Sequence, residues 1–100
     1  MFATIWRFVV SAEHVDEFER AYGPNGEWAQ LFARASGYAS TELLKQNDAD
    51  GVYLTIDRWL SEADFHAARR MLHDDYTELD RRFEAYTSEE TWLGTHTLLE

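Results

Sequence analysis

The feature that most restricts the fold is a pattern of strand, serine, helix and strand that occurs twice along the chain. The strand segments are rich in β-branched and aromatic residues, and the helical segments place apolar residues three and four positions apart. Two such units give the order β-α-β-β-α-β, a known supersecondary arrangement. We therefore predict one α+β domain over residues 1–100, with helices on one face of a four-stranded antiparallel sheet.

The first strand, predicted over residues 2–10, is apolar on both of its faces. Trp6, Phe8 and Val10 alternate with Ile5 and Val9. A strand with two apolar faces belongs in the centre of a sheet, where both faces are covered. The helices of the chain cover one face only, so a second copy of the sheet is the simplest cover for the other. The sequence thus predicts a homodimer formed sheet against sheet.

The first strand is followed by two short helices and a turn. Ser11 is predicted to cap the first helix. Gly23-Pro24-Asn25-Gly26 has the composition of a turn and separates that helix from the second. Gly37 is predicted to end the second helix in a left-handed conformation.

The second half begins with strands predicted over residues 38–46 and 52–60, joined by a hairpin loop. Ser61 is predicted to cap a long helix whose apolar stripe runs from Phe65 to Phe83, with an interruption at residues 73–75. A polar run over residues 87–90 is interpreted as a turn. The last strand is predicted over residues 91–99.

Charge and cysteine content exclude several classes of function. Nineteen acidic residues against nine basic ones give a formal charge of −10, which disfavours binding to nucleic acid or to anionic membranes. The chain has no cysteine, so disulfides, thiolate nucleophiles and zinc–thiolate sites are excluded. The N-terminal segment lacks the features of a signal peptide, and no apolar run has the length of a membrane span. We expect a cytoplasmic protein.

Three stretches of the sequence carry a resemblance to a known family. They are EFERAYGPNGEWAQLF at residues 17–32, GY at 37–38 followed by TELL at 41–44, and YLTIDRW at 53–59. With these stretches the chain resembles the antibiotic biosynthesis monooxygenase-like (ABM) group of the dimeric α+β barrel superfamily. The similarity covers almost the whole chain, and its motifs are mostly structural, so they do not name a substrate.

The resemblance implies a ferredoxin-like protomer whose sheet pairs with that of a partner, and a pocket between the sheet and the helices. Some members of the group oxidise aromatic polyketides with O₂ and no cofactor, and others degrade haem. Trp59 matches the pocket tryptophan of the haem-degrading branch, but Trp6 stands where that branch has asparagine, and its helical histidine has no secure match. This comparison disfavours haem degradation and favours an activity without a cofactor.

The long helix carries the candidate catalytic residues. A helical projection places Arg69 about 40° from the centre of the apolar stripe, His73 about 80° and His66 roughly 100° from it. Arg69 is a candidate to bind an oxyanion or enolate, and the alternative is an arginine whose stem lies along the core. His73 or His66 is a candidate general base, and His66 alternatively pairs with Glu62 on the surface.

Aromatic residues are the candidates for binding a substrate. Stacking favours planar ligands, so these side chains are predicted to line a flat cavity, while the alternative is that they fill the core. The candidates are Trp6, Trp28, Trp59, Tyr53 and Tyr76.

Asp57 lies in a strand that should be buried, and we expect it to form a structural ion pair or a dimer contact. No metal-ligand spacing, nucleophile triad, phosphate loop or flavin motif is visible in the sequence.

The sequence therefore predicts a small-molecule-binding domain, and specifically a cofactor-independent monooxygenase of planar aromatic compounds resembling quinols or polyketides. Two alternatives remain. One is a non-catalytic, dimeric binding or stress-related protein, and the other is a purely structural or partner-binding module.

Overall fold

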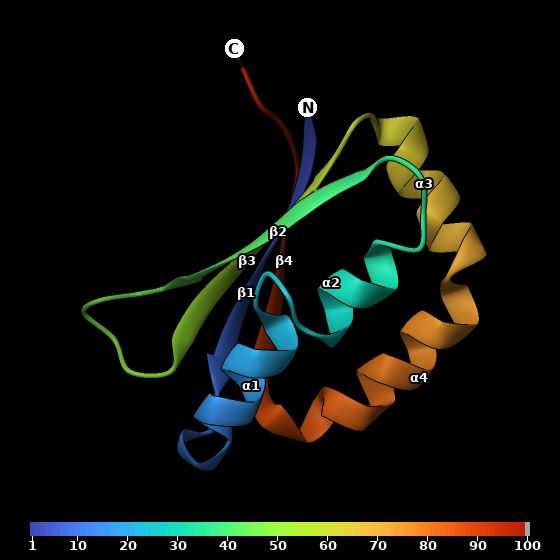
Figure 1. Ribbon diagram of the computed structural model, residues 1–100. Helices are drawn as coiled ribbons and strands as arrows, with labels where there is room; N and C mark the ends of the chain where they lie inside the picture. The colour runs from blue at the N-terminus through green and yellow to red at the C-terminus, as the bar shows by residue number, and fades with distance from the viewer. Residues whose placement is uncertain (100) are drawn as a thin grey trace.

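The structure is a computed structural model that describes residues 1–99, and its helices and strands follow the predicted β-α-β-β-α-β order (Figure 1). The first half consists of β1 (Phe2–Val10), the 3₁₀ turn η1 (Ala12–His14), α1 (Val15–Tyr22), α2 (Glu27–Phe32) and β2 (Tyr38–Lys45). The second half consists of β3 (Val52–Trp59), α3 (Glu62–Met71), α4 (His73–Phe83), the 3₁₀ turn η2 (Glu84–Tyr86) and β4 (Thr87–Thr97).

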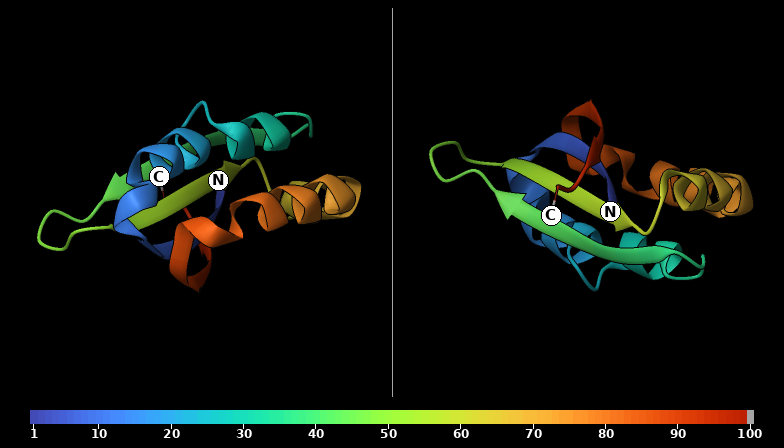
Figure 2. Two further views of the ribbon diagram at one scale, coloured as in Figure 1. Left: turned by 90° about the horizontal axis from the view of Figure 1, so that it is seen from below. Right: turned by 90° about the horizontal axis from the view of Figure 1, so that it is seen from above.

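The four strands form one antiparallel sheet in the order β2-β3-β1-β4. The helices lie on one face of this sheet, and the other face carries no helix (Figure 2). The strand β1 is central, as its two apolar faces predict, and the ferredoxin-like α+β fold is confirmed. The side chains of β1 and β3 that face the helices come from paired positions, such as Phe2 with Trp59 and Phe8 with Tyr53.

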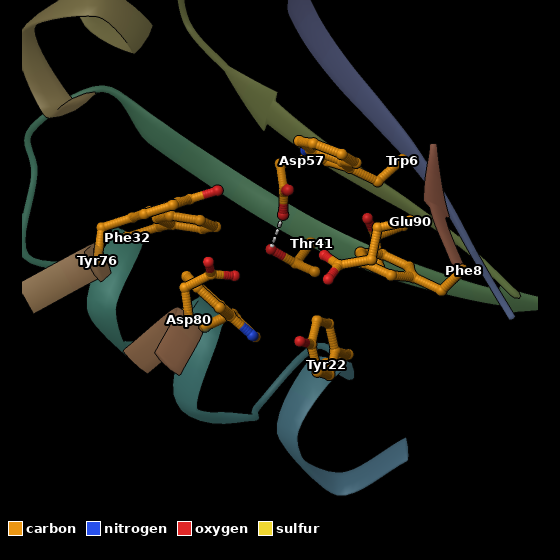
Figure 3. A pocket seen from close by; sticks show the side chains of 11 residues that line it. Trp6, Phe8, Tyr22, Phe32, Thr41, Asp57, Tyr76, Asp80 and Glu90 are labelled. Carbon is orange, nitrogen blue, oxygen red and sulfur yellow. Dashed lines mark hydrogen bonds between the residues drawn. The ribbon is translucent and has the colours of Figure 1, made fainter. Parts of the chain in front are cut away.

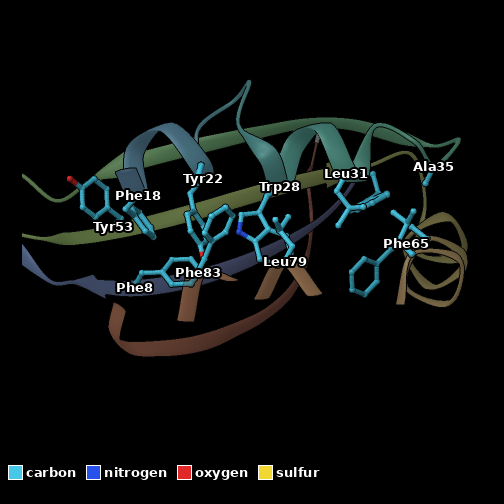
Figure 4. Packing of buried hydrophobic residues seen from close by; sticks show 14 of the residues in the cluster. Phe8, Phe18, Tyr22, Trp28, Leu31, Ala35, Tyr53, Phe65, Leu79 and Phe83 are labelled. Carbon is cyan, nitrogen blue, oxygen red and sulfur yellow. The ribbon is translucent and has the colours of Figure 1, made fainter. Parts of the chain in front are cut away.

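The core lies between the sheet and the helices and is dominated by aromatic rings (Figure 4). Phe18 and Tyr22 of α1 stack with ring centroids 4.2 Å apart, and Phe8 of β1 meets Tyr22 edge to face at 5.1 Å. Such paired rings contribute roughly 0.5–1.5 kcal/mol beyond their burial. The rings thereby fix α1 against the sheet and position one wall of the cavity described below.

The long helix predicted from residue 61 onward is divided at Leu72, directly before the predicted interruption. Leu72 has φ −100° and ψ 9°, which ends α3, and α4 begins at the next residue. The Leu72 side chain stays buried, so the apolar stripe continues across the break. The two helices meet at an angle in Figure 1.

Only one of the two serines predicted as helix caps makes a capping hydrogen bond. The Ser61 hydroxyl accepts a hydrogen bond of 3.1 Å from the backbone N–H of Asp64, which confirms the cap of α3. The Ser11 side chain makes no capping hydrogen bond, and a 3₁₀ turn precedes α1. The prediction for Ser11 was therefore wrong, because the chain enters α1 through a tighter turn that does not use the hydroxyl. Gly37 has the predicted left-handed conformation, with φ 93°, but it does not end the second helix, because α2 ends at Phe32 and turns separate it from Gly37.

The polar run over residues 87–90 is not a turn. It is the start of β4, where Thr87 pairs with Val10 and Glu90 pairs with Phe8. This strand is at the edge of the sheet and is exposed along most of its length, so polar side chains are tolerated on both of its faces. The turn is provided instead by η2, and β4 ends at Thr97, before the predicted end at residue 99.

The sheet face without helices carries an apolar patch. Ile5 and Val9 of β1 and Leu54 and Ile56 of β3 are only half-buried there. No described residue of the chain covers them, because the helices are all on the opposite face. This is the uncovered face that the sequence predicts.

Candidate functional site

A cavity of about 350 Å³ lies between the helix-covered face of the sheet and the helices (Figure 3). Its walls are mostly aromatic, and its polar groups are hydroxyls and carboxylates. The lining residues are Trp6, Phe8, Tyr22, Trp28, Phe32, Thr41, Thr55, Asp57, Tyr76, Asp80 and Glu90. This size and composition are typical of a site for a small organic ligand.

Asp57 is the most deeply buried carboxylate of the cavity. It lies in β3 on the face that the helices cover, and its side chain is only 8% exposed. The Thr41 hydroxyl donates a hydrogen bond of 2.6 Å to Asp57 Oδ1, and the Tyr38 hydroxyl lies 2.8 Å from that of Thr41. No other side chain among residues 1–99 bonds to the carboxylate, so the second oxygen is left to the cavity.

Burial raises the pKa of Asp57 from its usual value to about 6, and the hydrogen bond from Thr41 acts in the opposite direction. Transfer from water penalises the charged form, and no cation among the described residues pairs with this carboxylate. A carboxylate with a pKa near 6 is ionised at neutral pH and is a stronger base than an exposed aspartate. Asp57 can therefore accept a proton from a ligand in the cavity.

A smaller lobe of about 30 Å³ adjoins the cavity and shares Trp6, Phe32, Asp57 and Tyr76 with it. Arg69 of α3 lines this lobe, with its guanidinium carbon 5.6 Å from the ring centroid of Tyr76. Burial raises the pKa of Tyr76, and the positive charge of Arg69 opposes that rise. Arg69 forms no ion pair with any residue in the described part of the chain, so its charge remains available to a ligand.

The opposite end of the cavity is acidic. Asp80 of α4 and Glu90 of β4 line it, and both side chains are directed toward the same hollow as Asp57 in Figure 3. Partial burial raises the pKa of Glu90, and the negative charge of Asp80 raises it further. Asp80 and Glu90 are exposed and form the mouth of the large cavity, while Arg69, which is also exposed, lines the adjoining small lobe.

Five of the eight candidate residues from the sequence lie at this site. Trp6, Trp28 and Tyr76 line the large cavity, and Trp59 and Arg69 line the small lobe. The arginine lies over the rings of Tyr76 and Phe65, so its stem follows the core while its charged end reaches the lobe.

The other three candidates lie outside the cavity. His66 is 54% exposed and its Nε2 lies 3.2 Å from Glu62, as the surface alternative predicted. His73 is 76% exposed and its Nδ1 lies 3.2 Å from Asp74. The Tyr53 ring is buried against Phe18, and its hydroxyl donates to Glu19 on the outer side of α1. Neither imidazole nor this phenol contributes to the lining of either lobe.

The sequence interpretation missed the position of Asp57 in the cavity wall. It predicted an ion pair or a dimer contact, whereas the carboxylate is bonded to Thr41 and faces the cavity. The alternation of side chains along β3 contained the signal. Asp57 lies an even number of residues from Tyr53 and Trp59, which face the core, so it belongs to the same side of the strand. Asp80 and Glu90 gave no comparable signal, since both are exposed residues on polar stretches.

Neither a cluster of metal-ligating side chains nor a membrane-spanning helix is found among residues 1–99. Within residues 1–99, no three His, Asp or Glu side chains are grouped closely enough to hold a metal ion. None of the helices described over that range combines the length and apolar character needed to cross a bilayer.

The fold and the cavity together define a ferredoxin-like α+β protein with a cavity between its sheet and its helices. Residues 1–77 match the family model for antibiotic biosynthesis monooxygenases, and the chain belongs to this family. The match contains Asp57, Arg69 and Tyr76, whereas Asp80 and Glu90 lie beyond it. A comparison with curated proteins returned no sequence match.

Solved structures share the fold over nearly the whole chain. A proposed antibiotic biosynthesis monooxygenase from Deinococcus radiodurans is 14% identical, with a TM-score of 0.77 and coverage of 100% of this chain and 94% of that one. SnoaB, a cofactor-independent oxygenase from Streptomyces nogalater, is 24% identical, with a TM-score of 0.69 and coverage of 99% and 93%. PA3566 from Pseudomonas aeruginosa is 16% identical, with a TM-score of 0.67 and coverage of 99% and 94%.

Proposed function

We propose that the protein is a cofactor-independent monooxygenase that oxidises a planar, electron-rich aromatic compound with O₂. The observation that carries this proposal is a buried carboxylate, Asp57, inside a cavity with aromatic walls. A flat ring system stacks well against such walls, and a buried base next to it favours loss of a proton. SnoaB, an oxygenase of similar fold that needs no cofactor, supports the same class of reaction.

In the proposed reaction, Asp57 removes a proton from an acidic carbon or hydroxyl of the bound substrate. The resulting anion is delocalised over the rings, and the Arg69 guanidinium stabilises it from the small lobe. The anion gives electrons to O₂, a new C–O bond forms, and the O–O bond then breaks. For a ring CH₂ group the balance is R₂CH₂ + O₂ → R₂C=O + H₂O, so the substrate supplies all the electrons.

The walls have two further roles in this proposal. Trp6, Trp28 and Tyr76 hold the ring system in one plane beside Asp57, and Trp59 closes the inner lobe. Enclosure limits the access of water to the anion, which strengthens its interaction with Arg69 and suppresses side reactions. The histidines are not assigned the proton transfer, because both side chains lie outside the cavity.

Oxygen uptake with a panel of anthrones and hydroquinones tests the proposal, with the rate of spontaneous oxidation subtracted. We expect uptake by the wild-type protein and a loss of about 100-fold or more in Asp57→Asn. His66→Ala and His73→Ala are matched controls that remove a titratable group outside the cavity, and both should retain the wild-type rate. Tight binding of these compounds without uptake would instead identify a non-catalytic binding protein.

We further propose that the protein is a homodimer formed through the open face of the sheet. Ile5, Val9, Leu54 and Ile56 are apolar, half-buried and without a cover among the described residues. Contiguous apolar surface of this kind is typical of an interface. Two copies packed through it would leave both cavities free, because each cavity lies on the opposite side of its sheet.

A further inference from the structure

The charges around the cavity are distributed unequally. Asp57, Asp80 and Glu90 all line the large cavity, and no lysine, arginine or histidine among residues 1–99 does so. Arg69 lines the small adjoining lobe instead, and it is an exposed residue. A ligand that enters the large cavity therefore meets negative potential first.

The two acidic residues at the mouth act on the same space. The Glu90 carboxylate is partly buried and lies close enough to Asp80 for the negative charge of Asp80 to raise its pKa. Burial raises the pKa of Tyr22, whose ring lines the cavity, and the charges of Glu90 and Asp80 raise it further. Two carboxylates brought together without a cation repel each other, and a bound positive charge relieves this repulsion.

The aromatic walls favour a positive charge as well. The face of an aromatic ring carries negative partial charge, and a cation within about 6 Å of a ring centroid is attracted to it. Tyr22, Trp28 and Tyr76 line the cavity next to Asp80, and Trp28 meets Tyr76 edge to face with centroids 4.9 Å apart. Rings and carboxylates together form the type of site that selects an amine.

A second observation points to a ligand in this cavity. Asp57 is nine-tenths buried, and one of its carboxylate oxygens has no hydrogen-bond partner among the described side chains. In Figure 3 its side chain is directed into the same hollow as those of Asp80 and Glu90. Taking a carboxylate out of water is costly, and a ligand donor that bonds to this oxygen would offset the cost.

We infer that the cavity selects planar aromatic ligands that carry a positively charged amine, with the amine held between Asp80 and Glu90. This inference rests on the proposed aromatic site and names its substrate class. The ring system lies against Trp6 and Trp28, and the end of the ligand opposite the amine points toward Arg69. The site thus discriminates against planar aromatics that carry a carboxylate at the mouth end.

Three probes that share one ring system and cannot be oxidised in the same way test the inference. They are 9-(aminomethyl)anthracene, 9-(hydroxymethyl)anthracene and anthracene-9-carboxylate, and the anisotropy of their fluorescence reports binding. At low salt we expect the ammonium probe to bind about tenfold or more tightly than the carboxylate, with the neutral probe between them. The preference should fall at high salt, because the mouth is open to solvent.

A double variant and a matched control locate the preference. Asp80→Asn with Glu90→Gln should reduce the ratio of the two affinities to about one and retain binding of the neutral probe. Glu13→Gln with Asp50→Asn makes the same change in net charge at exposed positions that do not line the cavity, and should leave the ratio unchanged.

Each outcome has a defined meaning. Three results would overturn the inference. They are equal binding of all three probes, an affinity ratio of the ammonium and carboxylate probes that is unchanged in the Asp80/Glu90 variant, and binding of none of the probes. Equal binding would leave the oxygenase proposal standing, because that proposal requires an aromatic site and not a charge preference. Conversely, a clear preference for the ammonium probe without oxygen uptake on any substrate would overturn the oxygenase proposal alone.

Discussion

The Thr41 hydroxyl donates a hydrogen bond of 2.6 Å to Oδ1 of Asp57, and this bond joins β2 to β3 on the covered face of the sheet. The two residues are directly paired in the strand register. Because Asp57 is buried and has no cationic partner among the described residues, Thr41 is the group that favours its charged form. Burial therefore raises the basicity of this carboxylate, and a neutral neighbour moderates the rise.

Thr41→Val should raise the pKa of Asp57 above its value of about 6, since valine keeps the shape of the side chain and removes the donor. A hydrogen bond to a charged group contributes about 1.5 kcal/mol or more, which corresponds to a shift of roughly one unit. The expected result is that the rise of oxygen uptake with pH moves upward by about one unit. A pH–rate profile of both proteins measures it, and an unchanged midpoint would exclude Asp57 as the titrating base.

Asp57→Asn should stabilise the protein at neutral pH while removing its activity. The folded-state pKa of about 6 lies above the ordinary aspartate value of 3.8, so the folded protein holds the proton more tightly than the unfolded chain does. Stability therefore falls as pH rises from about 4 to 6, by about 3 kcal/mol in total. Asparagine avoids this loss and still accepts the bond from Thr41. Urea unfolding at pH 4 and pH 7 should show a gain at pH 7 only, and equal effects at both values would contradict the assignment.

Arg69→Ala should lower the rate of oxygen uptake by roughly tenfold or more, because an electrostatic contact to the developing anion is lost. The effect should fall mainly on kcat, since Arg69 lines the small lobe and not the mouth. Arg70→Ala is the matched control, because it removes an adjacent exposed arginine that lines neither lobe. Steady-state oxygen uptake gives both constants, and equal losses in the two variants would assign the effect to net charge.

Ser61→Ala should destabilise the fold by about 1 kcal/mol, because its hydroxyl satisfies the N–H of Asp64 at the start of α3. Ser11→Ala is a close control at the other predicted cap, where the side chain makes no capping bond, and its effect should stay within about 0.5 kcal/mol. The midpoints of urea unfolding compare the two. A larger loss in Ser11→Ala would contradict the helix starts described above.

Ile56→Glu should convert the proposed dimer into a monomer, because it places a charge in the apolar patch of the open sheet face. Leu60→Glu is the control, since Leu60 is an exposed apolar residue beyond the end of β3. Light scattering should give about twice the chain mass of 11.7 kDa for the wild type and for Leu60→Glu, and one chain mass for Ile56→Glu. A wild-type mass of one chain would end the dimer proposal.

The strands and helices were predictable where periodicity is strong. The alternation from Phe2 to Val10 gave the bounds of β1, and the stripe from Phe65 gave the helices that follow Ser61. The start of β4 at Thr87 was not predictable in this way, because an exposed edge strand needs no apolar alternation. Its polar residues look the same as those of a turn.

The site was predictable in its aromatic part and not in its charges. Trp6, Trp28 and Tyr76 were expected from their type alone, since large rings in a small domain lie in or next to the core. The proximity of Asp80 and Glu90 depends on the break before α4 and on the irregular pairing of β4 with β1. Neither of these structural features is visible in a local sequence pattern. The histidines of the long helix therefore looked like better candidates for the titratable residues of the site.

The break at Leu72 also affects how this protein can evolve. Arg69 precedes the break and Asp80 follows it, so the inner and outer charges of the cavity belong to separate helices. Insertion or deletion of one residue early in α4 rotates Asp80 by about 100° away from the mouth and leaves the register of α3 unchanged. Ligand preference can therefore change by a single small genetic event without loss of the inner lobe, and related proteins that differ in length here are expected to differ in the charge of what they bind.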